Sequence, residues 1–368
     1  MKRIMHIVQS SGGVERYILM LIKNMDLSKY ENILVCSYDY NKKNYNGLVM
    51  AFEHVDMHRE INFLKDYYAC IKIRKLIKKY SPDVVYMHSS KAGAIGRLAN
   101  IGLDNMSLYN PHGWSFNMDC GNFKRYIYRW IEKILSNFCT KIIAISEFEM
   151  KSALANNICN FNKIKVIFNG VDIEEYYQKN QLYHITKKDL GIPEEAYIFG
   201  TVGRLTKQKS PDVFINFAAL IKKEIPNAYF ILVGNGDQQA EIEEMIKTKK
   251  IADSVLITGW VDEPMQYIQL FDQAFLLSRW EGFGLVLAEY MLGRKPLVAT
   301  NVNAIPDLIE DGKNGVLVSP DDPYAVYIAA MKIYKDEMYR KQLVKNGLEC
   351  VKSRFDIRRV VKETVELL

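Results

Sequence analysis

Cysteine is sparse and scattered in this chain of 368 residues. None of the six cysteines stands in a C-x-x-C pair, and none belongs to a cluster with zinc-ligand spacing. Scattered thiols in a chain of this length are typical of a reducing compartment, where they pack as small hydrophobic side chains. Neither a disulfide scaffold nor a structural zinc site is therefore expected.

Long apolar runs are missing as well. No stretch approaches the roughly 18 apolar residues of a membrane-spanning helix. The apolar run at residues 1–9 is too short for a signal peptide and is typical of a first, buried strand. We expect a cytoplasmic protein that is at most held on the inner face of the cell membrane.

Acidic residues are comparatively scarce in the first half of the chain. The net charge is +6, but residues 1–180 carry 25 Lys and Arg against 17 Asp and Glu, which gives +8 there and −2 in the remainder. This excess favours an extended acidic partner for the first half, either an anionic membrane or a nucleic acid. Nucleic acid is the weaker candidate, because no reading motif or stacking platform accompanies the charge.

Two predicted helices combine this charge with aromatic residues. Residues 67–80 hold five Lys and Arg, and residues 123–138 combine four more with Phe123, Trp130 and Phe138. Basic and aromatic residues on one amphipathic helix predict contact with a membrane interface. For the second helix alone, the alternative is an ordinary helix that packs its apolar face on a sheet.

Short β-branched runs alternate with amphipathic helices along the chain. This alternation predicts an α/β fold with parallel sheets that are covered by helices on both faces. The pattern breaks near 169–180, and a polar stretch without strong periodicity, 174–188, precedes the second unit. We predict two doubly wound, Rossmann-like domains with a cleft between the carboxyl ends of their strands. The predicted strands are 4–8, 33–35, 84–87, 141–145, 164–168, 197–202, 229–233, 255–257 and 274–277.

Two loops are candidate phosphate sites. The first strand ends in S-S-G-G-V-E-R, which places Gly12 and Gly13 at a helix start, where backbone N–H groups suit a phosphate. The alternative is a tight turn with a positive φ. The spacing is not G-x-G-x-x-G, which disfavours a hydride-transfer enzyme. In the second half, the cations Arg204 and Lys209 directly follow a buried strand, which favours an anion site over a solvated loop.

Residues 278–289, S-R-W-E-G-F-G-L-V-L-A-E, form the most specific pattern in the chain. Gly282 and Gly284 place backbone N–H groups at a helix start, which is another anion site. Glu281 stands just before that helix, and Glu289 is expected about two turns into it, among apolar residues. A carboxylate there needs hydrogen-bond partners, which sugar hydroxyls supply. The alternative is a pair of salt bridges at a buried edge.

The pair Glu281 and Glu289 resembles the E-x(7)-E element of family 4 glycosyltransferases, which have the GT-B fold. Four further segments agree with that family in order and spacing: Gly12-Gly13, N-G-V-D at 169–172, Gly203-Arg204 with Lys209, and V-G-N-G at 233–236. The resemblance covers essentially the whole chain and extends to bacterial surface-polysaccharide enzymes. It implies an acceptor-binding domain at 1–170, a nucleotide-sugar-binding domain at 171–350, and a helix at 351–368 that crosses back to the first domain.

The resemblance also implies roles for individual residues. Arg204 and Lys209 would hold the donor diphosphate, which Gly12 and Gly13 would contact from the first domain. Glu281 would bind hydroxyls of the donor sugar. Glu289 would bind those of the ribose. The remaining donor-binding residues would be Gly203, Gly234, Gly282, Phe283, Gly284 and Leu285, with Trp260 and Val261 near the base.

Residues 109–116, Y-N-P-H-G-W-S-F, resemble the H-G loop of this family. His112 would then reach the reacting sugar and the leaving phosphate and donate a hydrogen bond to developing charge, as a neutral or protonated ring. The alternative is a histidine that caps local backbone. Upstream, His88, Ser89 and Lys91 follow another strand and are expected to face the acceptor, unless Ser89 or Ser90 only caps the next helix.

The enzyme class that the resemblance implies uses neither a metal nor a cofactor. The sequence contains no D-x-D triplet, the usual handle for a metal-bound diphosphate, so cationic side chains would do that work. The implied reaction moves a sugar from a nucleotide sugar, a UDP-sugar by family habit, to a hydroxyl of a lipid-linked saccharide, and it keeps the α configuration. No carboxylate stands out as a nucleophile in the first-half loops. The resemblance instead implies front-face attack, with the leaving phosphate as base.

Two other interpretations remain open. A UDP-sugar epimerase shares this architecture, but it needs carboxylates around the sugar ring, and the first half shows no such group. A catalytically silent nucleotide-sugar-binding subunit of an assembly complex is the second. It would be expected to have lost some of the site residues, but all are present: His112, Arg204, Lys209, Glu281 and Glu289.

Overall fold

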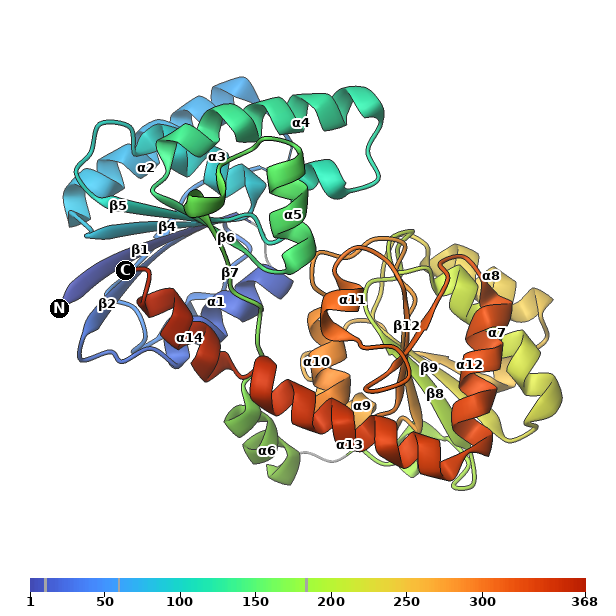
Figure 1. Ribbon diagram of the computed structural model, residues 1–368. Helices are drawn as coiled ribbons and strands as arrows, with labels where there is room; N and C mark the ends of the chain where they lie inside the picture. Colours follow the sequence, from blue (N-terminus) through green and yellow to red (C-terminus); the bar gives the residue numbers. More distant parts are fainter. Residues whose placement is uncertain (10–11, 59, 183–184) are drawn as a thin grey trace. The chain divides into compact units, whose positions relative to one another are not determined.

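The computed structural model describes residues 1–9, 12–58, 60–182 and 185–368. The chain divides into two compact units, Met1–Gly170 with Ile357–Leu368, and Val171–Asp356. Each unit is a parallel sheet between layers of helices (Figure 1). The predicted α/β class, with two Rossmann-like units, is confirmed.

The sheet of the first unit has the strand order β3-β2-β1-β4-β5-β6-β7, and the paired strands run parallel. Helices α2, α3 and α4 cover one face, and α1 and α14 lie together on the other (Figure 1). The strands are β1 Lys2–Val8, β2 Tyr30–Cys36, β3 Ala51–His54, β4 Val84–His88, β5 Met106–Asn110, β6 Lys141–Ala144 and β7 Ile164–Val166. The helices are α1 Gly13–Lys23, α2 Phe63–Tyr80, α3 Ser90–Ala99, α4 Asn122–Leu135, α5 Glu147–Ala155 and α14 Ile357–Val365.

The sheet of the second unit has the order β10-β9-β8-β11-β12-β13, again with parallel pairs. Helices α7, α8 and α12 pack on one face, and α9, α10 and α13 on the other (Figure 1). The strands are β8 Tyr197–Val202, β9 Ala228–Val233, β10 Val255–Ile257, β11 Gln273–Leu276, β12 Leu297–Thr300 and β13 Val316–Val318. The helices are α6 Ile173–Leu182, α7 Pro211–Glu224, α8 Gln239–Thr248, α9 Pro264–Leu270, α10 Leu285–Leu292, α11 Ile305–Leu308, α12 Pro323–Lys335 and α13 Glu337–Arg354.

Strand order reverses once in each sheet, between β1 and β4 in the first unit and between β8 and β11 in the second. Connections on the two sides of a reversal leave on opposite faces of the sheet, so a crevice opens beyond the carboxyl ends of those two strands. In the first unit, Gly12 lies in the loop after β1 and His88 is the last residue of β4. In the second unit, Arg204 and Glu281 lie in the loops after β8 and β11. The topology thus gathers the predicted site residues of each unit.

Four strands were missed by the sequence patterns. In β3 and β5 the runs are interrupted by Glu53, His54, Ser107 and Asn110, so neither strand is a continuous apolar segment. Strands β12 and β13 have only 4 and 3 residues, too few for a periodic signal.

Two further expectations were wrong. The stretch after residue 173 is helix α6, whose start is marked by Asp172: its Oδ1 accepts the N–H of Glu175 at 2.9 Å. The last helix is not continuous. The chain leaves α13 at Phe355, whose carbonyl accepts the N–H of Val171 at 2.8 Å, and α14 begins at Ile357. In a continuous helix this carbonyl would instead accept the N–H of Arg359, four residues further on.

Candidate active site

The loops after β8 and β11 are bonded to each other at the reversal of the second sheet. The N–H of Arg279 donates to the carbonyl of Gln208 at 2.8 Å, and the side chain of Gln208 donates to the carbonyl of Trp280 at 3.0 Å. Lys209 Nζ lies 2.5 Å from Glu281 Oε2. The structure therefore brings together two of the predicted catalytic residues, which lie 72 positions apart in the sequence.

Glu281 is held in place by several groups. Its Oε2 accepts from Lys209 and from Ser278 Oγ, at 3.1 Å, and its N–H donates to Asn303 Oδ1 at 3.2 Å. Within the described part of the chain, no hydrogen bond to its Oε1 is present. The side chains of Lys209 and Glu281 remain 21% and 11% exposed, so the pair can be reached from solvent. One carboxylate oxygen is thus available for a hydroxyl group.

Arg204, unlike Lys209, has no partner among the residues that the structure describes. Its side chain is exposed, and among the described residues none forms a hydrogen bond or ion pair with the guanidinium. The loop below it is fixed, since the N–H of Leu205 donates to Asn235 O at 2.9 Å. A fixed loop with a free guanidinium is suited to bind a diphosphate.

The glycines of V-G-N-G hold this loop. Gly234 has φ 136°, and a Cβ there would lie 2.2 Å from the carbonyl oxygen of Gly203. Gly236 approaches Leu205 in the same way, again at 2.2 Å. Gly234 therefore supports the loop that carries Arg204 by close backbone packing.

Helix α10 starts directly beyond Glu281. Gly284 takes φ 81°, ψ 55°, and α10 begins at Leu285. Phe283 is buried against the ring of Phe355, and Gly282 and Leu285 are partly exposed. The first N–H groups of a helix have no acceptor within it and carry partial positive charge, so this end attracts an anion.

Glu289 lies nearer to the helix start than expected. It is the fifth residue of α10, about one turn in rather than two, because the helix begins only after Gly284. Glu289 is buried. The next residue, Tyr290, joins the helix to both strands of the reversal: its hydroxyl accepts the N–H of Val202 at 2.8 Å and donates to Phe275 O at 3.1 Å. Tyr290 was not identified from the sequence, since an aromatic residue in an apolar run is indistinguishable from core.

Trp260 and Val261 follow β10 at the same edge of the second sheet. Gly259, with φ 72°, forms an isolated bridge with Gly234. Beyond it, the indole of Trp260 is 68% exposed. An aromatic ring with an open face at this position is available to stack on a base.

In the first unit, Gly12 caps α1 with φ 84°, ψ −125°, a conformation that favours glycine. A Cβ at Gly12 or Gly13 would meet no described atom within 4 Å, so the space beside this helix start is open. The preceding Ser10 and Ser11 lie outside the described residues. The predicted turn with positive φ and the open approach to the backbone are both present here.

His112 stands on a strained turn just beyond β5. It has φ 53°, and Gly113 has φ 106°. Asn110 Oδ1 accepts the N–H of His112 at 2.9 Å, which holds the turn. Glu149 Oε2 accepts the N–H of Trp114 at 2.8 Å, and its carbonyl accepts the indole N–H at 2.9 Å. Burial raises the pKa of Glu149 to about 7.

Among the predicted acceptor-side residues, His88 does not lie as expected. His88 is fully buried, so it cannot touch an acceptor. Lys91 Nζ forms a salt bridge with Asp66 Oδ2 at 2.6 Å and also donates to Glu60 O. Ser89 occupies the N-cap position of α3 at φ 74° without a capping hydrogen bond from its side chain, so the helix-cap alternative is not supported either.

His88 instead joins a chain of histidines. His6 Nδ1 lies 3.2 Å from His88 Nε2, and His88 Nδ1 lies 3.1 Å from His112 Nε2. Burial lowers the pKa of His6 to about 4 and that of His112 to about 3, and burial together with its two histidine neighbours lowers the pKa of His88. The three rings are therefore neutral near pH 7. His6 was missed, because one histidine in a buried strand is more often a core residue.

These histidines predict a loss of stability in acid. A histidine with a pKa of 6.5 when unfolded and about 4 when folded binds more protons in the unfolded chain. The stability that such a histidine contributes is therefore fully present above pH 6.5 and is lost as the pH drops toward 4. Each histidine lowers the free energy of unfolding by about 1.4 kcal/mol per pH unit in this range. Glu149 has the opposite effect. Because its pKa is raised in the folded state, the folded state binds its proton more tightly, and acid stabilises the fold through this residue.

Urea unfolding across this pH range isolates one histidine. His6→Gln removes one titrating group and is expected to reduce the slope by about 1.4 kcal/mol per pH unit. Asn100→Ala removes a buried amide of the same unit but no titrating group, and it should keep the wild-type slope. A His6→Gln slope equal to that of Asn100→Ala would show that His6 is not held neutral.

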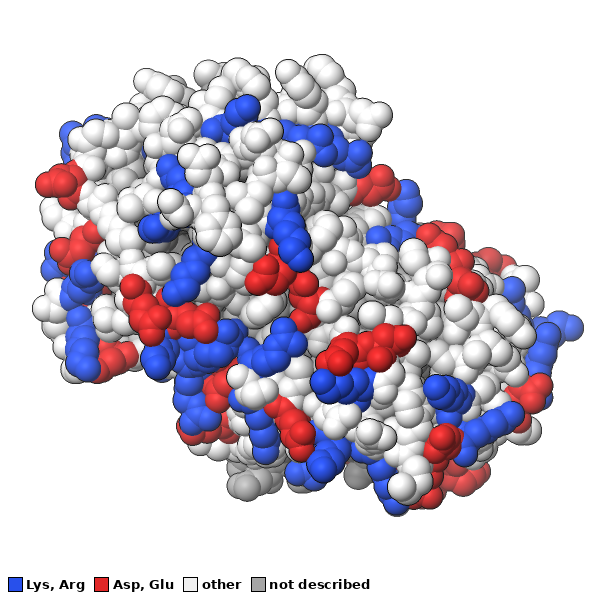
Figure 2. Space-filling model, viewed as in Figure 1, with Lys and Arg blue, Asp and Glu red and all other residues white. Residues whose placement is uncertain are grey.

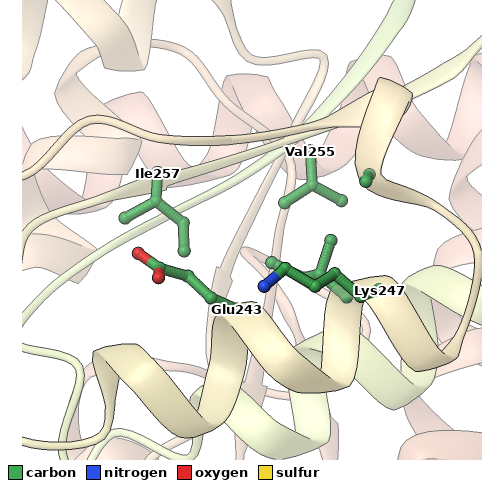
Figure 3. A pocket seen from close by; sticks show the side chains of 6 residues that line it. Glu243, Lys247, Val255 and Ile257 are labelled. Carbon is green, nitrogen blue, oxygen red and sulfur yellow. The ribbon is translucent and has the colours of Figure 1, made fainter.

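A hollow of about 260 Å³ lies elsewhere, between α8 and the edge strand β10. Figure 3 shows Glu243 and Lys247 on α8 facing Val255 and Ile257. Ile246 and Ala252 complete its lining, and none of the predicted site residues contributes. This hollow is separate from the candidate site.

Within the ranges that the structure describes, no group of three or more His, Cys, Asp and Glu side chains is placed to hold a metal ion. Among the same residues, no helix combines the length and the apolar character that crossing a bilayer requires.

Comparison with known proteins covers both units. Residues 11–175 match the model of glycosyltransferase family 4, and residues 182–349 match that of glycosyl transferases group 1. The chain is 26% identical over 352 residues to UDP-Gal:alpha-D-GlcNAc-diphosphoundecaprenol alpha-1,3-galactosyltransferase of Escherichia coli, over 93% of this chain and 91% of that enzyme. It is 31% identical over 327 residues to a 41.2 kDa protein in the cps region of Klebsiella pneumoniae, over 87% and 86%.

A solved structure agrees over the full length. HepE of Anabaena, in complex with UDP-glucose, superposes with a TM-score of 0.83 at 20% identity and 100% coverage of both chains. Taken with the two family models and the Klebsiella relative, this shows that the chain is a glycosyltransferase of the GT-B fold and belongs to glycosyltransferase family 4.

Proposed function

We propose that this glycosyltransferase moves a sugar from a UDP-sugar to a hydroxyl of a lipid-linked saccharide during assembly of a bacterial capsule, exopolysaccharide or other surface glycan. The observation that carries the proposal is the contact of Lys209 with Glu281, together with Arg204, whose guanidinium has no partner in the described part of the chain. The name of the Escherichia coli relative supports the donor and the lipid diphosphate acceptor, and the UDP-glucose in HepE supports the nucleotide.

In the second unit, each group of the donor has a matching residue. Arg204, Lys209 and the start of α10 bind the diphosphate, and Oε1 of Glu281 accepts from a sugar hydroxyl. Glu289 binds the ribose, and Trp260 with Val261 holds the base. In the first unit, Gly12, Gly13 and His112 follow β1 and β5 at the carboxyl edge of the sheet, and we assign to them contacts with the reacting groups.

The reaction proceeds without a metal ion or cofactor in this proposal. The leaving diphosphate is stabilised by Arg204, Lys209 and helix N-termini, which are fixed before the reaction. Retention of the α configuration follows by front-face attack. Glu149, the carboxylate that contacts the His112 loop, is buried and accepts from Trp114 N–H and Asn117, so its oxygens are not open to a sugar.

Product analysis tests this function. The enzyme is incubated with a UDP-sugar and a synthetic diphosphate-linked saccharide in EDTA, and the anomeric coupling of the product is read by proton NMR. An α-linked product is expected. A β-linked product would reject retention, an isomerised donor would establish the epimerase, and donor binding without turnover would favour the silent subunit.

We further propose that the first unit binds the anionic inner face of the cell membrane. Helix α4 is anchored by the buried Glu132 and Leu135, but its apolar side faces outward. Phe123 and Trp130 are 77% and 57% exposed, and Tyr126 and Ile134 are exposed on the same side. Packing of this side on the sheet, the ordinary alternative, is therefore wrong for these residues.

Charge surrounds this apolar side. Lys124, Arg125, Arg129 and Lys133 lie on the same helix, and Figure 2 shows Lys and Arg over α4, where Asp and Glu are scarce. Helix α2, on the same face of the sheet, exposes further apolar residues: Phe63, Leu64, Tyr67, Tyr68 and Ile71. Apolar and aromatic groups among cations fit an anionic lipid surface.

Sedimentation with phosphatidylglycerol vesicles at low salt tests the membrane proposal. The wild-type chain is expected to sediment, and Phe123→Ser with Trp130→Ser to weaken binding by about tenfold or more, because two interfacial anchors are lost. Ile328→Ser, an exposed apolar residue of the second unit, serves as the control and should bind as wild type. Equal sedimentation with uncharged phosphatidylcholine vesicles, or none with either, contradicts the proposal.

A further inference from the structure

A buried asparagine ends the chain of histidines in the first unit. Asn32, on β2, places its Oδ1 3.1 Å from His6 Nε2. From there the contacts run across three parallel strands: β2 to β1 at His6, β1 to β4 at His88, and on to the loop after β5 at His112. Asn32, His6 and His88 are at most 1% exposed, whereas His112 is partly exposed.

Other groups around the rings are aromatic or neutral. Tyr17 packs its ring edge-on against His112, with centroids 4.7 Å apart, and its hydroxyl lies 3.3 Å from that of Tyr86. Tyr86 packs against both His6 and His88. Asn110 holds the backbone of His112. Among the described residues no carboxylate or cation contacts the rings, so each histidine stays neutral and carries one proton.

Counting protons then fixes the direction of every hydrogen bond. Oδ1 of Asn32 can only accept, so the proton of His6 lies on Nε2 and its Nδ1 is an acceptor. His88 must therefore donate from Nε2, which leaves its own Nδ1 as an acceptor. His112 must in turn donate from Nε2. The last nitrogen, Nδ1 of His112, keeps a lone pair, and within the described part of the chain nothing is bonded to it.

We propose that Asn32, His6 and His88 are positioning residues, which fix His112 as an Nε2–H tautomer so that its Nδ1 presents a hydrogen-bond acceptor at the carboxyl edge of the first sheet. Asn32 sets the tautomer of His112 through the two histidines that lie between them in the hydrogen-bond chain. If its amide were turned, NH₂ would donate to His6, all three protons would move to Nδ1, and His112 would present a donor instead.

An acceptor nitrogen selects its partner by chemistry. An ionised phosphate oxygen has no proton to give and repels a lone pair, whereas a hydroxyl group donates to it readily. Resting on the proposed function, His112 then binds a hydroxyl of a saccharide and does not stabilise the leaving phosphate. Cations of the second unit are left to carry that charge.

Histidine tautomers can be observed directly in the unliganded protein. The full chain is labelled with ¹⁵N-histidine, and two-bond ¹⁵N–¹H correlations are recorded near pH 7, with single His→Gln variants for assignment. His6, His88 and His112 are each expected to show the pattern of a neutral Nε2–H ring. An Nδ1–H pattern for His112, or an imidazolium signal for any of the three, overturns the proposal.

Asn32→Ala tests the control by the asparagine. Without the acceptor, the His112 signal is expected to show both tautomers, and kcat/KM to fall about tenfold, the effect of one misdirected hydrogen bond. Asn100→Ala, which removes another buried amide of the same unit, should leave the histidine signals unchanged. A fall in kcat/KM with an unaltered His112 tautomer contradicts the relay. Correct tautomers in a protein without transferase activity would instead contradict the proposed function alone.

Discussion

Replacing Arg204 by alanine is expected to lower kcat/KM by about 10²–10³-fold, the range seen when a fixed donor to developing charge is removed. The guanidinium is exposed and unpartnered among the described residues, so it contributes little to the fold. Its loop is held independently by Gly234 and by the N–H of Leu205. Activity should therefore fall without a change in melting temperature.

Lys223→Ala provides the matched control. Lys223 is an exposed cation in the last turn of α7, within the same unit but away from the carboxyl edge of the sheet. Both variants should melt as wild type, and only Arg204→Ala should lose steady-state transferase activity. Loss of less than about tenfold in Arg204→Ala would remove this residue from the diphosphate site.

Replacing Arg97 by methionine is expected to destabilise the first unit by about 3–5 kcal/mol. Arg97 is fully buried, and its Nη2 lies 2.8 Å from Oε2 of Glu132. Tyr109 donates to the other oxygen at 2.8 Å, and its ring lies 3.9 Å from the guanidinium carbon. Methionine fills the space but leaves the Glu132 carboxylate buried without its cation.

Urea unfolding of a second variant separates charge from packing. Arg97→Met with Glu132→Leu removes both charges, and much of the lost stability is expected to return, because an apolar pair needs no desolvated charge. If the single variant unfolds at the wild-type urea concentration, the ion pair does not hold α4. If the double variant is no more stable than the single one, packing rather than charge accounts for the loss.

Much of the candidate site in the second unit was predictable, because its residues follow directly after strands in the sequence. A strand followed by glycines or cations, and then by a helix, places those residues at the carboxyl edge of a parallel sheet. Arg204, Lys209, Gly284 and Glu281 all obey this pattern. The pairing of Lys209 with Glu281 was not predictable, because it depends on which strands meet at the reversal.

The first unit shows where sequence patterns fail. The chain from Asn32 to His112 joins polar residues that are distant in the sequence. Asn32 and His6 carry no local signal, and the patterns that single out His88 and His112 do not reveal that the two rings touch. Helix α4 has the amphipathic pattern of a packed helix, yet it buries Glu132 and Leu135 and turns Phe123 and Trp130 outward. Periodicity identifies such a face but not whether protein or solvent covers it.

Nucleotide release is the most direct test of the central claim, that this chain is a metal-independent transferase of a UDP-sugar. The purified protein is mixed with UDP-, GDP- and dTDP-sugars in EDTA, with and without a membrane lipid extract. The account predicts that UDP is released from one donor, that release requires the extract, and that Arg204→Ala abolishes most of it. Release that stops in EDTA, or that comes from a GDP- or dTDP-sugar alone, would contradict it.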